Sequence, residues 1–245
     1  MMFVGVDGCR AGWFAVALGE DDDWDMDVFP DMSGLWDELS DSCLILLDIP
    51  IGLKERETRE RLCDVEARRL LGPKRGSSVF PVPCRPSIYG PTYEEASKIN
   101  EQMTGRRLSL QTWNIVPKIR EVDALLRNSK TVRSCIRETH PEVCFWAMAG
   151  HPMRHNKKTK EGFSERFEVL RSVHPLTTEI ARQAFSSYRR KDVARDDILD
   201  ALSAAVTAVA GEKNLSSIPE TPEVDSKGLP MEIVYHPHFK TPPKP

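Results

Sequence analysis

The most informative stretch of this 245-residue sequence is Val4-Gly5-Val6-Asp7-Gly8-Cys9-Arg10-Ala11-Gly12-Trp13. An apolar strand ends near Asp7, and a glycine-containing turn leads directly into a second apolar strand, Phe14 to Leu18. Two strands joined by so short a turn are typical of a β-hairpin. Because an unpartnered buried carboxylate is costly, we expect Asp7 to lie at a sheet edge or in a cleft where a cation or a donor reaches it.

The segments after this hairpin predict an α/β fold with a mixed sheet. Residues 24–29 alternate apolar and acidic side chains, as a half-buried third strand does, and short loops make the first three strands antiparallel. Ser33 can cap a short helix. Residues 43–47 are apolar on both faces, which is typical of a central strand. A fifth strand is predicted over residues 132–138.

A helical insertion is predicted over residues 54–130. Two helices, 59–71 and 93–104, flank a loop rich in proline, serine and glycine, and a third helix follows Pro117. Structured loops of this length often act as functional lids. We therefore predict a single domain over residues 1–236 that contains this insertion, followed by a flexible proline- and lysine-rich tail over residues 237–245.

A second carboxylate, Asp48, follows the predicted central strand. Pro50 and Gly52 come directly after it and end the strand. Ligand sites in open α/β sheets lie at the carboxyl ends of strands, so Asp48 is a candidate ligand. The alternative is that Asp48 simply caps a turn.

A third group of acids opens a predicted helix. Asp196, Asp197 and Asp200 share one side, opposite an apolar stripe that consists of Ile198, Leu199, Leu202, Val206 and Val209. Small residues farther along the acidic side would let this helix lie close to the sheet, which would bring its carboxylates near Asp7 and Asp48. The alternative is that acids in a first turn only favour the helix dipole.

Asp7, Asp48, Asp197 and Asp200 are therefore predicted to converge. Hard oxygen ligands without clustered histidine or thiolate select Mg²⁺ or Mn²⁺, and two such ions assist phosphodiester hydrolysis. Additional predicted groups are Arg10, Lys158 and Arg166 as phosphate or substrate contacts, and Glu142, His140 and Asp196 as accessory residues.

The net charge of −3 excludes an overall polycation, so any contact with nucleic acid would come from local basic patches. Candidate patches are Lys157-Lys158-Thr159-Lys160, Arg68-Arg69 and Arg189-Arg190-Lys191. Solvated surface charge is the simpler interpretation of each patch taken alone. The sequence does not indicate which nucleic acid would bind, or an oligomeric state.

The cysteines and the apolar runs indicate the cellular compartment in which we expect the protein. The six cysteines form no Cys-x-x-Cys pair and no zinc-finger spacing, which favours a reducing, cytoplasmic environment. Because the sequence enters an apolar strand at once, we expect no signal peptide. Because the longest apolar run is too short to span a bilayer, we expect no membrane partner.

Together these motifs resemble the domain-of-unknown-function family 429, usually described as predicted nucleases of the ribonuclease H-like fold. The matching stretches are Gly5 to Trp13, Asp48 to Leu53, Cys63-Asp64 with Ala67-Arg68, Ser78 to Pro81, Pro117 to Asp123, His140 to Glu142, Lys158-Thr159, Asp196 to Ala201, Gly228 to Pro230 and the strand 231–235. The resemblance implies a five-stranded mixed sheet with three antiparallel and then parallel strands, flanked by helices. It also implies catalytic metals on Asp7, Asp48, Asp197 and Asp200.

Three other interpretations remain open. An Asp-Gly turn between the first two strands also binds phosphate in sugar kinases and actin-like ATPases. A metal- or nucleotide-binding module could keep the acids without turnover. Finally, the acids could cap secondary structure in a protein that only assembles with partners.

Overall fold

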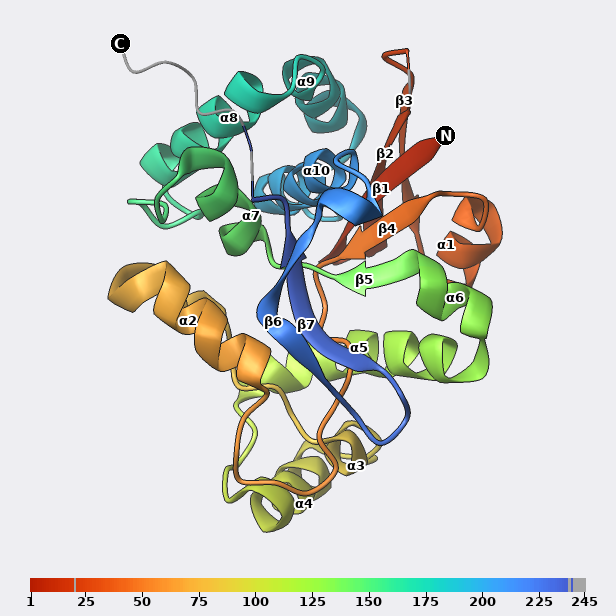
Figure 1. The fold of residues 1–245 in the computed structure, drawn as a ribbon, viewed down its shortest axis with the longest axis vertical. Coiled ribbons are helices and arrows are strands. Elements are labelled where there is room, and N and C mark those ends of the chain that lie inside the picture. Colours follow the sequence, from red (N-terminus) through yellow and green to blue (C-terminus); the bar gives the residue numbers. More distant parts are fainter. Residues whose placement is uncertain (20, 238, 240–245) are drawn as a thin grey trace. The chain divides into compact units, whose positions relative to one another are not determined.

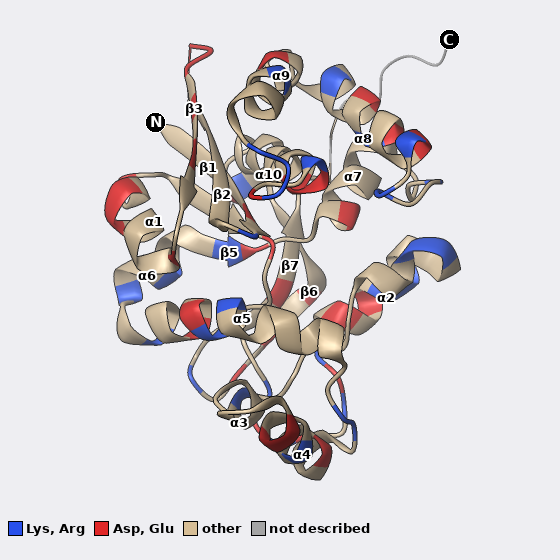
Figure 2. Cartoon of the chain, turned by 180° about the vertical axis from the view of Figure 1, so that it is seen from behind, with Lys and Arg blue, Asp and Glu red and all other residues tan. Residues whose placement is uncertain are grey.

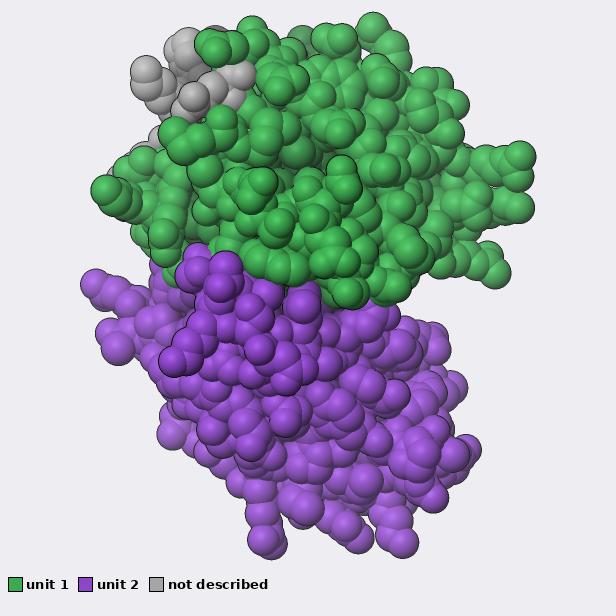
Figure 3. All heavy atoms as spheres, turned by 90° about the vertical axis from the view of Figure 1, so that its right-hand side faces the viewer, with its two compact units in different colours: residues 1–48, 135–216, 234–245 green, residues 49–134, 217–233 purple. Residues whose placement is uncertain are grey.

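The computed structural model describes residues 1–19, 21–237 and 239 (Figure 1), so most of the tail predicted over residues 237–245 lies outside the described residues. The chain forms two compact units, coloured in Figure 3. Unit 1 comprises residues 1–48, 135–216 and 234–245, and unit 2 comprises residues 49–134 and 217–233.

Unit 1 is built on a five-stranded mixed sheet. Its strands are β1 (Met2–Cys9), β2 (Gly12–Gly19), β3 (Trp24–Phe29), β4 (Leu44–Leu47) and β5 (Ile136–Glu138), in the order β3-β2-β1-β4-β5. The first three strands pair antiparallel, whereas β4 runs parallel to both β1 and β5. The predicted α/β class and mixed sheet are confirmed, and this arrangement is consistent with a ribonuclease H-like fold.

The fifth strand is shorter than the predicted span of residues 132–138. Residues Lys130–Cys135 form helix α6, and only Ile136–Glu138 pair with β4. Val132, Cys135 and Ile136 are all buried. Because they are three and four residues apart, this apolar spacing fits one face of a helix as well as it fits a strand.

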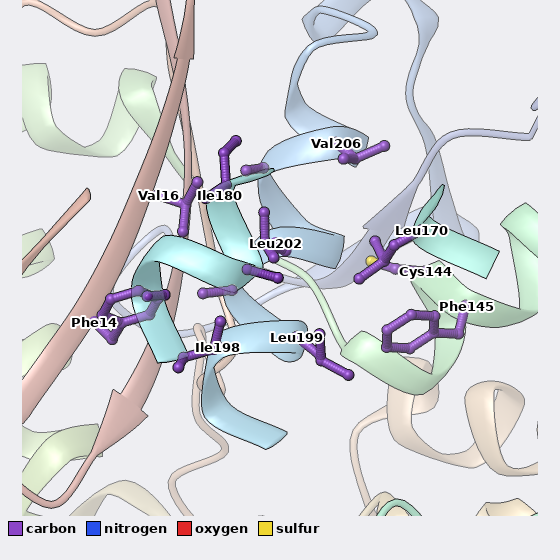
Figure 4. Close-up of a cluster of buried hydrophobic side chains, with 14 of the residues drawn as sticks. Phe14, Val16, Cys144, Phe145, Leu170, Ile180, Ile198, Leu199, Leu202 and Val206 are labelled. Atoms are coloured by element: carbon purple, nitrogen blue, oxygen red, sulfur yellow. The ribbon is translucent and has the colours of Figure 1, made fainter. Parts of the chain in front are cut away.

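Helices of unit 1 complete its core. They are α1 (Met32–Leu39), α7 (Pro141–Ala149), α8 (Lys160–Val173), α9 (Thr177–Ser187) and α10 (Arg195–Ala208). Asp31, rather than the predicted Ser33, caps α1 by accepting a hydrogen bond from Gly34 N. Helix α10 packs on the sheet and contacts α7, α8 and α9. Figure 4 shows the predicted apolar stripe, including Ile198 and Leu202, in one cluster with Phe14 of β2.

Helix α10 lies directly against the backbone of β1 at Gly5. A Cβ atom at Gly5 would lie 2.0 Å from the nitrogen of Ala205 and 2.2 Å from the carbonyl oxygen of Ala201. No side chain larger than hydrogen fits there. Since side chains alternate along a strand, Asp7 lies on the same face of β1 as Gly5 and faces this helix.

Unit 2 contains the predicted helical region. Its helices are α2 (Leu62–Arg75), α3 (Arg85–Ile88), α4 (Tyr93–Thr104), α5 (Leu110–Asn128) and most of α6, and a short 3₁₀ turn (Gly76–Ser78) follows α2. Gly72, with φ of 66°, kinks α2 instead of ending it as predicted. Strands β6 (Ser216–Val224) and β7 (Pro230–Tyr235) form a separate two-stranded sheet, and only β7 was predicted. Within the described part of the chain, no helix is long and apolar enough to cross a membrane.

Candidate metal centre

The sheet places Asp7 and Asp48 side by side. Strands β1 and β4 run parallel with Val6 opposite Leu47, and the Asp48 nitrogen donates to the Val6 carbonyl at 3.0 Å. Leu46 packs against Ala204 of α10, so Asp48, two residues farther along, lies on the face that α10 covers. Both aspartates therefore leave the ends of neighbouring strands on the same face.

Helix α10 contributes the third carboxylate. One side-chain oxygen from each of Asp7, Asp48 and Asp200 lies within 4.8 Å of the other two. Asp7 is 7% exposed and Asp200 is 1% exposed, while Asp48 is partly exposed. These three residues, which we call the acidic triad, form a buried cluster that could hold a metal ion.

Crowding of the acidic triad disfavours its charged form. Burial and, after it, the charge of Asp48 raise the pKa of Asp7 well above its usual range. Burial and the charge of Asp200 raise the pKa of Asp48 to about 7. A positive charge nearby is therefore needed to keep Asp7 and Asp48 ionised at neutral pH.

Lys157 supplies one such charge. Its Nζ atom lies 2.5 Å from Asp200 Oδ2 and 3.8 Å from Asp196 Oδ2. The charge of Asp200 holds the pKa of Lys157 above its usual range, so the ammonium group stays charged. The neighbouring Lys158, which we predicted as a phosphate contact, is exposed. In a loop no periodicity tells which of two adjacent lysines points inward, so no sequence pattern selects Lys157 over Lys158.

Asp197 lies near the acidic triad but has a local partner. Its Oδ2 atom accepts a hydrogen bond from the Ala194 nitrogen at 2.9 Å, at the start of α10. Burial raises the pKa of Asp197 to about 6, and its charge contributes to the raised pKa of Asp7. Asp197 therefore stabilises the start of α10, as the alternative interpretation of the sequence anticipated, and it also lies near the triad.

A second buried pair joins Glu142 to Arg166. Arg166 is 1% exposed, and its guanidinium group bonds to the Glu142 carboxylate, to the Gly162 carbonyl at 2.9 Å and to the His155 carbonyl at 3.1 Å. The charge of Glu142 contributes to the raised pKa of Asp48, so this pair lies close to the triad. His140 caps α7 by accepting from the Glu142 nitrogen at 3.2 Å. We predicted that Arg166 contacts phosphate. Because Arg166 is buried and bonded to Glu142, its position instead favours a role in holding Glu142 in place.

Comparison with known proteins identifies the family of this chain. Residues 5–224 match the family described as "Protein of unknown function (DUF429)". The matched range includes every residue of the site. The chain belongs to the DUF429 family. The resemblance inferred from the motifs is therefore confirmed. No curated protein and no solved structure matches the chain.

In this DUF429 protein, we expect Asp48→Asn to stabilise the metal-free fold by about 1–3 kcal/mol at about pH 8. The Asp48 carboxyl titrates near 4 when unfolded and at about 7 when folded. Its contribution to stability is fully present below about pH 4 and is lost as the pH rises through 7. The free energy of unfolding, measured with urea in EDTA, should fall less between about pH 5.5 and about pH 8 in the variant than in the wild type. An identical pH dependence in both proteins would contradict this account.

Proposed function

We propose that this DUF429 protein is a metal-dependent nuclease that hydrolyses phosphodiester bonds. In this proposal Asp7, Asp48, Asp197 and Asp200 hold two Mg²⁺ or Mn²⁺ ions. The observation that carries the proposal is the convergence of three carboxylate oxygens within 4.8 Å, from β1, β4 and α10. A nucleic acid is the expected partner because its phosphodiester links are the substrate of this chemistry.

The donor set fits a hard divalent cation. The triad offers only carboxylate oxygens, which Mg²⁺ and Mn²⁺ prefer over softer ligands. Burial and, after it, repulsion among the acids raise the pKa of both Asp7 and Asp48, and a bound cation would relieve that repulsion. Lys157 offers one positive charge to several acids, so the cluster has negative charge left to bind a metal ion.

Each residue then has a separate task. When bound, two divalent ions would stabilise the attacking and leaving oxygens of the hydrolysis. Asp7 is the proposed shared ligand, because its carboxyl group is affected by the charges of Asp48, Asp200 and Asp197, the three other proposed ligands. Arg166 holds the Glu142 carboxylate in place near Asp48. Arg10, exposed at the turn after β1, is the proposed phosphate contact.

A cleavage assay tests this proposal. The purified protein is incubated with branched DNA, single-stranded DNA and an RNA–DNA hybrid, in Mg²⁺, in Mn²⁺ and in EDTA. We expect cleavage of at least one substrate in Mg²⁺ or Mn²⁺ and none in EDTA. Metal binding without cleavage of any substrate would favour the non-catalytic binding module. If the protein binds no divalent metal, the proposed centre is wrong, and phosphate binding of the sugar kinase type becomes the better interpretation.

We also expect Lys157→Gln to lower the Tm in EDTA at about pH 8 by about 2–6 °C. The variant leaves the buried Asp200 without its partner, although the effect is moderated because the Lys157 side chain is 36% exposed. Added Mn²⁺ should reduce this difference in Tm between the variant and the wild type, since a bound cation offsets the negative charge of the triad that Lys157 otherwise offsets. Lys158→Gln is the matched control and should leave the Tm unchanged, because Lys158 is exposed. Equal deficits with and without Mn²⁺ would argue against metal binding at the triad.

A further inference from the structure

The loop that joins α9 to α10 carries three consecutive cations. Arg189, Arg190 and Lys191 are all exposed, and the loop is the blue segment between these helices in Figure 2. Helix α10, which follows it, carries Asp200 of the acidic triad. From sequence alone, solvated surface charge was the simpler interpretation of this triplet.

The loop is fixed on the turn that follows Asp7. The Ala11 nitrogen, in the β1–β2 turn, donates to the Asp192 carbonyl at 3.1 Å. Within the loop, the nitrogens of Asp192 and Val193 both donate to the Arg189 carbonyl, at 2.8 and 3.0 Å, and Val193 is buried. Two segments far apart in sequence are thereby joined, and the exposed Arg10 comes next to the triplet. We call Arg10, Arg189, Arg190 and Lys191 the basic cluster.

In the part of the chain that the structure describes, no carboxylate forms an ion pair with this basic cluster. Some exposed arginines elsewhere in the chain do pair with acids: Arg107 with Glu101 at 2.9 Å and Arg171 with Glu168 at 2.5 Å. Among the residues that the structure describes, none of the four members of the cluster forms an ion pair. A group of cations without counter-charges keeps a positive potential that attracts polyanions.

We propose that the basic cluster binds the phosphate backbone of a nucleic acid next to the acidic triad. This inference rests on the proposed function for the class of ligand. Only Gly8 and Cys9 lie between Asp7 and Arg10, and α10 connects the triplet to Asp200, so both parts of the cluster are joined to elements that carry the triad. A nuclease needs such contacts because its carboxylates alone would repel the neighbouring phosphates.

The cluster should read the backbone and not the bases. The aromatic residue closest to it in sequence is Tyr188, whose hydroxyl donates to the Met26 carbonyl at 3.1 Å and whose ring packs edge-on against Phe14. That half-buried ring is therefore already held by contacts within the protein. Backbone contacts by arginine and lysine carry no sequence information, so binding should depend on salt and not on sequence.

Fluorescence anisotropy in EDTA, where metal-dependent cleavage is blocked, tests this inference. The probes are two labelled DNA duplexes of unrelated sequence, titrated with protein between about 50 and 200 mM salt. We expect the wild type to bind both equally. The triple variant R189Q/R190Q/K191Q should bind about 10- to 100-fold more weakly at low salt, and its slope of log K against log salt should be about 2–3 smaller. K98Q/K130Q/K213Q removes the same charge from exposed positions outside the cluster and should bind nearly as the wild type does.

The outcomes separate this inference from the proposed nuclease activity. It is overturned if the wild type binds neither duplex, if the triple variant keeps the wild-type slope, or if both triple variants weaken binding equally. Cleavage with an unchanged slope in R189Q/R190Q/K191Q would overturn the inference and leave the nuclease intact. Salt-dependent binding through the cluster without cleavage would support the inference while the nuclease proposal fails. Circular dichroism of both variants should match the wild type, because all substituted side chains are exposed.

Discussion

Asp7→Asn is expected to lower the rate of nucleic-acid cleavage by at least about 10³-fold, which corresponds to about 4 kcal/mol of transition-state stabilisation. The substitution keeps the size of the side chain and removes its charge. Asp7 shares the 4.8 Å cluster with Asp48 and Asp200, so its loss affects every metal position that the triad can form. Cleavage rates in Mg²⁺ and Mn²⁺ measure the effect, and calorimetric titration with Mn²⁺ should show weaker binding.

Two controls give this result its meaning. Asp37→Asn, at an exposed position on α1, makes the same chemical change outside the site and should retain wild-type cleavage and metal affinity. The stability of Asp7→Asn in EDTA at neutral pH should match or exceed that of the wild type. Burial raises the pKa of Asp7, so the folded protein bears a cost for the ionised form that asparagine does not. A loss of activity then reflects chemistry and not unfolding.

Other outcomes would point elsewhere. Wild-type cleavage by Asp7→Asn would refute the two-metal mechanism at this site. Weaker Mn²⁺ binding by Asp7→Asn, in a protein that cleaves no substrate, would support the non-catalytic metal module. Asp197→Asn is expected to have a smaller effect on metal affinity, because Asp197 Oδ2 already accepts a hydrogen bond from the Ala194 nitrogen.

Local sequence patterns predicted much of the sheet. The β1–β2 hairpin follows from two apolar strands and a short turn, and β4 follows from a run that is apolar on both faces. Strand β6 was missed: it contains two prolines, Pro219 and Pro222, which argue against a strand when read locally. Its pairing with β7 is a tertiary contact, and no pattern within residues 216–224 reports it.

The sequence predicted which strands and which helix carry the acids of the candidate site. Strand ends and a helix start identified the acids, but helical spacing alone could not choose among Asp196, Asp197 and Asp200, because residues three and four apart share a face. The rotation of α10 makes that choice. Ala201 and Ala205 face Gly5 of β1, which fixes Asp200 beside the sheet. That rotation depends on a contact between residues far apart in sequence.

Gly5→Ala is therefore expected to cost at least about 4 kcal/mol, which is comparable to the whole stability of a typical domain. Its methyl group would lie 2.0 Å from the Ala205 nitrogen and 2.2 Å from the Ala201 carbonyl, both backbone atoms that no side-chain rotation can move. Helix α10 would have to shift away from β1 and disrupt the core that it forms with Phe14 and Leu202. Urea unfolding and the soluble yield on expression measure the loss.

Gly34→Ala is the matched control for this substitution. Gly34 lies in α1, where an added Cβ would meet only the Asp31 side chain at 3.7 Å, an ordinary contact. Because alanine favours the helix, this variant should keep or slightly raise the stability. An unfolding midpoint of Gly5→Ala close to that of the wild type would mean that α10 does not rest on β1 as described. If the Gly5→Ala variant folds with lowered stability, its Mn²⁺ affinity should fall as well, since displacement of α10 carries Asp200 away from Asp7 and Asp48.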